Sequence, residues 1–248
     1  MDPARFRMPS RTVEQRLGFR LEPATEKLLR QNVKMIETIS GDRLRREIEL
    51  IFNEVRPERI LQRAGELGIL KQLHPALRGD GWLAENFALL RREGLPAHTL
   101  ITLYLCLLVY HFTEKDMDSF LTRFKWPQET AHAMRDTTKI RDRIDLLGGL
   151  PTGKSGIYRM LDGYSLPAIR INKLAADSPV VKRRLRLFLN RLHCIKPLLS
   201  GEELMRLGVP AGPELGWLLQ KLLDAKLDGN LKTKEEEEKL VKRWMKKI

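Results

Sequence analysis

The sequence predicts an all-α protein built as an elongated array of many helices. Leu, Arg, Lys and Glu, which favour helices, are plentiful, whereas β-branched residues are sparse outside residues 100–110. Apolar residues recur at helical spacing, and the strict alternation of apolar and polar residues that is typical of strands is hard to find. A chain of 248 residues can bury a full core and is compatible with one elongated or two compact domains.

The most regular pattern covers residues 40–77, which we predict to form a helical hairpin. Ser40 stands where a side-chain oxygen can cap the first helix, and apolar residues then recur on one face. Pro57 suits the first turn of the second helix, because its missing N–H has no partner there, and Gly68 suits the end of that helix.

The remaining helices are predicted from apolar spacing, from capping residues and from the prolines that interrupt them. Pro9 lies in the middle of a first candidate helix, where it removes a hydrogen bond and clashes with the preceding turn. Candidate capping boxes pair Thr113 with Asp116, Ser200 with Glu203, and Thr233 with Glu236. Further helices are expected at residues 23–36, 82–92, 96–112, 113–124, 128–147, 167–176 and 179–195, near Tyr158, around residues 215–222 and at the C-terminal end.

The charge of the chain favours a polyanionic partner. The formal net charge is +13, and residues 179–248 contain sixteen Lys and Arg against nine Asp and Glu, which is 16 − 9 = +7. The candidate RNA-binding residues lie off the apolar stripe of the helix at 179–195, where a solvated basic face is the alternative: Lys182, Arg183, Arg184, Arg186 and Arg191. Gly212 opens a later helix whose backbone N–H groups suit a phosphate, although a tight turn explains the glycine equally well.

Other features indicate a cytoplasmic protein that does not enter a membrane. The longest apolar run, about eleven residues, is well short of the ~20 that span a bilayer. The first residues lack the apolar region of a secretory signal. Cys106 and Cys194 are far apart and lie in apolar stretches, so both are predicted to be reduced core cysteines.

Residues 148–155 match the phosphate-loop pattern G-x-x-x-x-G-K-[ST], which alone predicts an ATPase or GTPase. Such a loop needs a strand before it, yet residues 141–147 predict a helix, and the strand-like run at 100–110 ends without a carboxylate. We therefore expect a loop before a helix, with a phosphate-loop hydrolase using Lys154 and Ser155 as the alternative.

Several motifs, in the same order, resemble one family of enzymes. P-E-R-I-L at residues 57–61 and L-G-I-L with H-P-A-L at 67–77 resemble the helical region that follows the catalytic head in bacterial CCA-adding tRNA nucleotidyltransferases and poly(A) polymerases. Residues 14–19 are similar to the end of that family's neck helix, and residues 199–213 to its tail motif. The resemblance implies a neck remnant at 1–37, a helical body at 38–178 and a basic tail at 179–248.

The resemblance also implies what the chain lacks. Family members hold magnesium with paired carboxylates in a separate head domain, whereas Asp116 and Asp118 lie on a predicted helix, where residues two apart point in different directions. We therefore expect no catalytic residue and no cofactor on this chain, with magnesium bound only if a separate head is present. Asp2 and Arg5 match the edge of the family's nucleotide-selecting motif, although Pro9 follows closely.

The function expected from the resemblance is that of the RNA-binding half of such an enzyme. It would bind tRNA or another structured RNA through phosphate contacts and be inactive without a head on a separate chain. Besides the phosphate-loop hydrolase, the remaining alternative is a truncated gene product that acts only as a helical scaffold.

Overall fold

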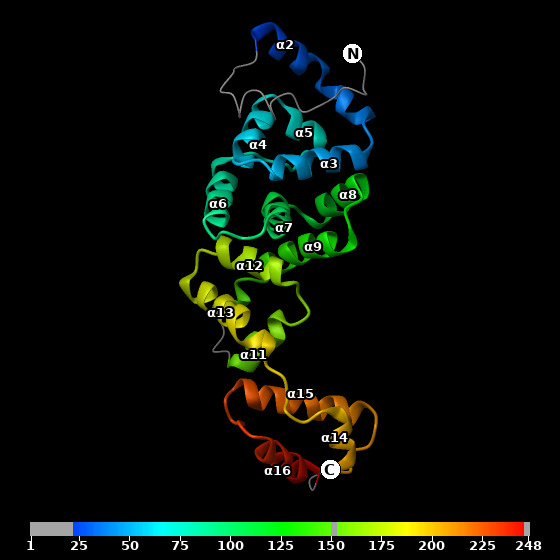
Figure 1. The fold of residues 1–248 in the computed structure, drawn as a ribbon, viewed down its shortest axis with the longest axis vertical. Coiled ribbons are helices and arrows are strands. Elements are labelled where there is room, and N and C mark those ends of the chain that lie inside the picture. Colours follow the sequence, from blue (N-terminus) through cyan, green and yellow to red (C-terminus); the bar gives the residue numbers. More distant parts are fainter. Residues whose placement is uncertain (1–21, 150–152, 246–248) are drawn as a thin grey trace. The chain divides into compact units, whose positions relative to one another are not determined.

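A computed structural model describes residues 22–149 and 153–245. Within these ranges every regular element is an α-helix or a short 3₁₀ helix, which confirms the predicted all-α class (Figure 1). In the same ranges no helix is both long and apolar enough to span a bilayer. The described residues form two compact units: the first extends to Asp142 and includes Tyr164–Ala175, and the second contains Arg143–Gly163 and the rest from Ala176.

The first unit is centred on α7, Ala97–Leu108, in which residues 103–108 are all buried. Phe87 stacks on Tyr104 with ring centroids 4.2 Å apart, and Phe52 contacts both rings. The strand-like run at residues 100–110 is therefore a core helix, as expected from its length. The other helices of this unit are α2 (Pro23–Asn32), η2 (Val33–Thr38), α3 (Gly41–Phe52), α4 (Pro57–Glu66), α5 (Ile69–Leu73), α6 (Gly81–Arg91), α8 (Glu114–Phe124), α9 (Gln128–Asp142) and α12 (Leu166–Ala175).

The predicted hairpin is formed by α3 and α4. Pro57 occupies the first turn of α4, and Gly68 follows its end with a φ of 78°, a left-handed conformation that glycine adopts without strain. Ser40 is the N-cap residue of α3, but its side chain makes no capping hydrogen bond, so this detail of the prediction is wrong. The N-terminus of α3 instead lies very close to the end of α8: a Cβ atom on Gly41 would be 1.7 Å from the carbonyl oxygen of Arg123.

The second unit contains shorter helices and a separate apolar core. Leu204, Leu218, Leu222 and Val241 are buried in the core formed by its last three helices. Its elements are α10 (Leu146–Gly149), α11 (Lys154–Leu161), α13 (Pro179–Asn190), η3 (Leu192–Cys194), α14 (Gly201–Arg206), α15 (Pro213–Leu227) and α16 (Lys234–Met245). The two units are defined only by contacts between described residues. They do not test the predicted division into neck, body and tail, which stays a prediction.

Two corrections concern the ends of predicted helices, and a third concerns a cysteine. The helix expected at residues 128–147 is interrupted after Asp142, and the helix expected at 179–195 ends at Asn190. After Asn190 the backbone turns so that Leu192 is buried, which leaves Cys194 exposed. Cys194 is therefore not a core cysteine, whereas Cys106 is buried, and burial raises the pKa of its thiol to about 12.

All three predicted capping boxes are present. Thr113 and Asp116 exchange reciprocal bonds at the start of α8, as do Ser200 and Glu203 at α14, and Thr233 and Glu236 at α16. The Lys234 ammonium and the capping bonds also lower the pKa of Glu203 to about 2. Local sequence therefore determines where these three helices begin.

We predict that Gly41→Ala destabilises the first unit by about 1–3 kcal/mol, because the added methyl group meets a backbone oxygen that no rotamer change can move. The matched control is Gly65→Ala in α4, where the nearest atom is a leucine methyl at an ordinary 3.7 Å. Alanine favours a helix over glycine by up to ~1 kcal/mol, so this control should be neutral or stabilising. Urea unfolding followed by circular dichroism compares them, and equal stability of the two variants would contradict the predicted clash.

Candidate nucleic-acid interface

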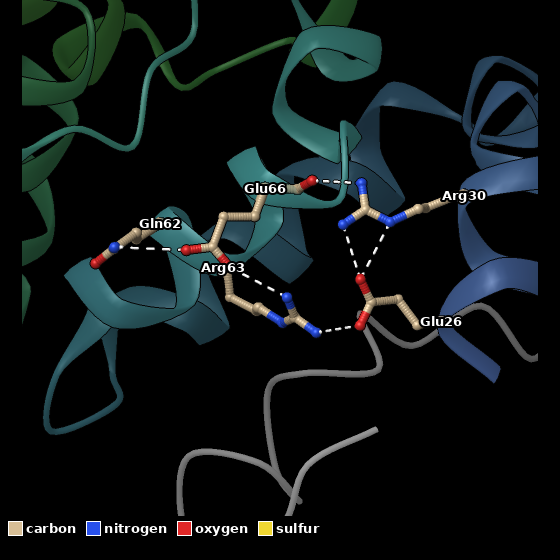
Figure 2. A network of polar contacts seen from close by, with 5 residues as sticks. All are labelled: Glu26, Arg30, Gln62, Arg63 and Glu66. Carbon is tan, nitrogen blue, oxygen red and sulfur yellow. Dashed lines mark hydrogen bonds and ion pairs between the residues drawn. The ribbon is translucent and has the colours of Figure 1, made fainter. Parts of the chain in front are cut away.

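A network of charged side chains connects α2 to the hairpin (Figure 2). The Glu26 carboxylate accepts hydrogen bonds from Arg30 Nε and Nη2, at 3.1 and 2.7 Å, and from Arg63 Nη2 at 2.7 Å. Arg30 also donates to the carbonyl oxygen of Glu66 at the end of α4, at 2.7 Å. The bonds from Arg30 and Arg63 hold the pKa of the Glu26 carboxyl below its ordinary value. These two arginines therefore help to hold α2 against α4.

Other arginines of the first unit also pair with carboxylates of the protein. Arg91 makes a bidentate pair with the Glu58 carboxylate, at 2.7 and 2.8 Å, which raises the pKa of the arginine. Arg170 pairs with Glu93. Because the charge of such arginines is compensated by carboxylates, a count of basic residues overstates the positive charge available to a partner.

The basic segment, residues 178–201, lies in the second unit. It contains six Lys and Arg residues and no Asp or Glu: Lys182, Arg183, Arg184, Arg186, Arg191 and Lys196. Ser178 caps α13 by accepting from the backbone N–H of Val181, and Pro179 occupies the first turn. Val181, Leu185 and Phe188 bury the apolar face of α13. The helix therefore directs its basic side chains away from the core.

The five predicted RNA-binding side chains of this segment differ in their surroundings. Arg183, Arg186 and Arg191 are exposed, and Lys182 is half-buried. Arg184 is also half-buried, and its guanidinium donates to the carbonyl oxygen of Leu147 in α10. Arg184 therefore connects α13 to α10, which gives it a structural role that its place in the sequence did not indicate.

Gly212 is the N-cap residue of α15. Its φ of 144° lies in the range that residues with a Cβ atom rarely adopt, and it is exposed. The turn alone thus explains the glycine, and the binding of a phosphate at the start of α15 stays a prediction. The predicted nucleotide-binding residues, Asp2 and Arg5, lie outside the described residues.

The described residues of the phosphate-loop motif, 148–149 and 153–155, lie in a setting that differs from a nucleotide site. Helix α9 precedes the motif and α10 contains its first two residues, where a strand leading into the loop is required. The Asp228 carboxylate occupies the N-terminus of α11: Oδ1 accepts from the Ser155 backbone N–H at 3.0 Å, and Oδ2 from the Ser155 hydroxyl at 2.7 Å. Burial alone would raise the pKa of Asp228, but these bonds and one from the Lys154 backbone keep it below its ordinary value of 3.8. The phosphate-loop hydrolase is therefore not favoured.

The Asp-x-Asp sequence is likewise engaged in structure. Asp116 is part of the capping box of α8, and Asp118 pairs with Arg135. In the ranges that the structure describes, no group of three His, Cys, Asp or Glu side chains is arranged to bind a metal ion.

Sequence reasoning missed two residues of the second unit. Asp228 gave no signal, because its partners are 73 residues away. Trp217 is 49% exposed on α15, and its place off the apolar stripe of Leu218 and Leu222 is a signal that a helical wheel could have detected.

Comparisons with known proteins agree with this arrangement. A family model described as "Probable RNA and SrmB- binding site of polymerase A" matches residues 18–79, which include α2 and the hairpin. An A-adding tRNA nucleotidyltransferase of Geobacter sulfurreducens is 27% identical over 93% of this chain. A solved CCA-adding enzyme with CTP has a TM-score of 0.72 and 25% identity over 94% of the chain. The chain is similar to proteins of the CCA-adding enzyme and poly(A) polymerase family.

The match concerns a helical portion of this family's proteins. The chain spans 28% of the length of the Geobacter relative and 57% of the solved enzyme with CTP. The Thermotoga maritima CCA-adding enzyme complexed with tRNA has the same fold over 94% of this chain, with a TM-score of 0.68 and 24% identity. The alternative of a truncated gene product that acts only as a helical scaffold is not favoured, because the matching family model describes an RNA-binding site.

We predict that Asp228→Ala destabilises the second unit by about 1–2 kcal/mol at neutral pH, because three backbone and side-chain donors of α11 lose their acceptor. The folded-state pKa of Asp228 is lowered, so the carboxylate stabilises the fold above its unfolded pKa of ~3.9. The difference between the variant and the unmodified chain should therefore begin to shrink as pH falls below about 4, and it should be lost as pH falls through the lower folded-state pKa.

Thermal unfolding across a pH series measures this difference. Asp177→Ala is the matched control, because Asp177 is an exposed carboxylate in the loop before α13, and its removal should change stability little. A difference for Asp228→Ala that does not shrink between pH 7 and about pH 2 would exclude a role for the charged carboxylate.

Proposed function

We propose that this chain is the RNA-binding helical portion of a tRNA nucleotidyltransferase of the CCA-adding and poly(A) polymerase type. The single observation that supports it most directly is the basic segment, in which α13 exposes Arg183 and Arg186 and in which carboxylates are absent from the sequence. Exposed cations of one sign attract phosphates and release their counterions, so the proposed contacts are to the RNA backbone. The tRNA bound by the similar Thermotoga enzyme supports tRNA as the partner.

The proposed contacts differ between residues. Arg183, Arg186 and Arg191 carry the phosphate contacts, and Lys182 contributes from its half-buried position. Arg184 acts chiefly by connecting α13 to α10. Gly212 offers the N-terminal N–H groups of α15 to a phosphate.

The proposed portion transfers no nucleotide by itself. Nucleotide transfer in the family requires magnesium held by paired carboxylates, and the described carboxylates of the Asp-x-Asp sequence are engaged in a helix cap and an ion pair. The catalytic carboxylates and the magnesium ion are proposed to belong to a head outside these 248 residues, on the same polypeptide or on a separate chain.

We predict that the purified chain binds tRNA with an affinity that falls steeply as salt rises. Arg183→Gln with Arg186→Gln should weaken binding about tenfold at low salt and reduce the slope of log affinity against log salt by about two, because two phosphate contacts are lost. Fluorescence anisotropy with labelled tRNA over a salt series measures both quantities.

The matched control is Arg92→Gln with Lys115→Gln, which makes the same change in net charge at exposed residues of the first unit. Equal losses for the two double variants would show that only the overall charge matters and would contradict an RNA-binding role of α13. Labelled ATP in the same series should not bind, and ATP binding that depends on Lys154 would favour the nucleotide hydrolase instead.

We predict that the pure chain incorporates no CMP or AMP into a tRNA that lacks its terminal CCA, with or without magnesium. An intact CCA-adding enzyme serves as the positive control, and incorporation of radiolabelled CMP is the measurement. Incorporation that scales with the concentration of this chain would show that the 248 residues contain an active site.

A further inference from the structure

Trp217 is an unusual surface residue of the second unit. It lies on α15 and is 49% exposed, whereas Leu218 and Leu222 of the same helix are buried. A tryptophan ring is large and mostly apolar, so leaving it in water forgoes substantial hydrophobic stabilisation. Exposed rings of this kind are enriched at binding surfaces.

The surroundings of the ring combine aromatic and cationic groups. The Lys221 ammonium lies one turn further along α15, at 5.5 Å from the centre of the Trp217 ring. Trp244 of α16 is also near, with the centroids of the two tryptophan rings 6.2 Å apart and their planes inclined by 60°. A second ring and a cation therefore lie near the exposed indole of Trp217.

This combination suits a nucleobase with its phosphate. Every base has a flat π-face that stacks on an indole, and the negative phosphate next to it pairs with an ammonium group. A base presents its face only where RNA is unpaired or at the end of a helix, because the faces inside a duplex are covered by neighbouring bases. Residues 179–248 carry a net charge of +7. This charge favours an anionic ligand such as RNA over an uncharged, apolar surface of another protein.

We propose that Trp217 stacks on an unpaired base of the bound RNA, with Lys221 pairing the adjacent phosphate and Trp244 supporting the indole ring. This inference rests on the proposed RNA-binding function and adds a base contact, without readout of base identity, to the phosphate contacts of α13. Stacking is insensitive to salt, whereas phosphate contacts are sensitive to it, so the two kinds of contact are separable by experiment.

The experiment measures binding of the full chain to tRNA, to an RNA hairpin with an unpaired loop and to a fully paired RNA of the same length, each over a salt series. Trp217→Ala should weaken binding to tRNA and to the hairpin about tenfold at every salt concentration, with the salt slope unchanged. Trp217→Phe, which keeps a ring, should remain within about threefold of the unmodified chain. Binding to the paired RNA should change little in either variant.

Met205→Ala is the matched control, because Met205 is a similarly exposed apolar residue of the same unit, at 42%, without a π-face. Circular dichroism shows whether each variant is folded, and the Phe variant tests stacking if the Ala variant unfolds. Equal affinities of Trp217→Ala and the unmodified chain, equal losses for Met205→Ala, or equal losses for paired and unpaired RNA would each overturn the stacking role. Failure of the unmodified chain to bind any of these RNAs would instead overturn the proposed function itself, and the stacking role with it.

Discussion

The structure depends on how the ends of short helices obtain hydrogen-bond partners. Among the described residues no helix exceeds fifteen residues, and each end leaves several backbone N–H or C=O groups without a partner inside the helix. Carboxylates and hydroxyls serve the N-terminal ends, as Asp80 does at α6 and Asp228 at α11. In α16 the fully buried Glu237 extends this chemistry, since its carboxylate accepts from the backbone N–H groups of Leu198 and Leu199.

Arginine side chains donate to the backbone carbonyl oxygens at the C-terminal ends of several helices. Arg123 donates to the last residue of α5, Arg30 to the last residue of α4, and Arg141 to the carbonyl oxygen of Phe112 after α7. Arg45 and Arg184 likewise donate to the carbonyl oxygens of Lys125 and Leu147. A cation at the C-terminal end of a helix also complements the partial negative charge there. Part of the positive charge is therefore used within the structure, and the charge available to a partner is smaller and more localised than the sequence indicates.

Interactions between near neighbours in the sequence could be predicted, and those between distant residues could not. The capping boxes at Thr113, Ser200 and Thr233 involve residues three apart, so their residue types suffice to predict them. The partners of Arg184 and Asp228 are 37 and 73 residues away, and nothing in the local sequence distinguishes them from exposed charges. The exposure of Cys194 was missed for a related reason, since an apolar stretch predicts burial without showing where a helix ends.

The phosphate-loop motif shows how one physical requirement can be met by different partners. Glycines followed by a lysine and a serine leave free N–H groups at the start of a helix, and those groups bind an anion, whether it is a phosphate or a carboxylate. In this chain the tertiary structure provides the carboxylate of Asp228, so the motif stabilises the second unit. The chemistry available to a partner must then come from groups that the fold does not use for itself. The exposed arginines of α13 and the half-exposed ring of Trp217 meet that condition, and both suit RNA, one through its phosphates and the other through its bases.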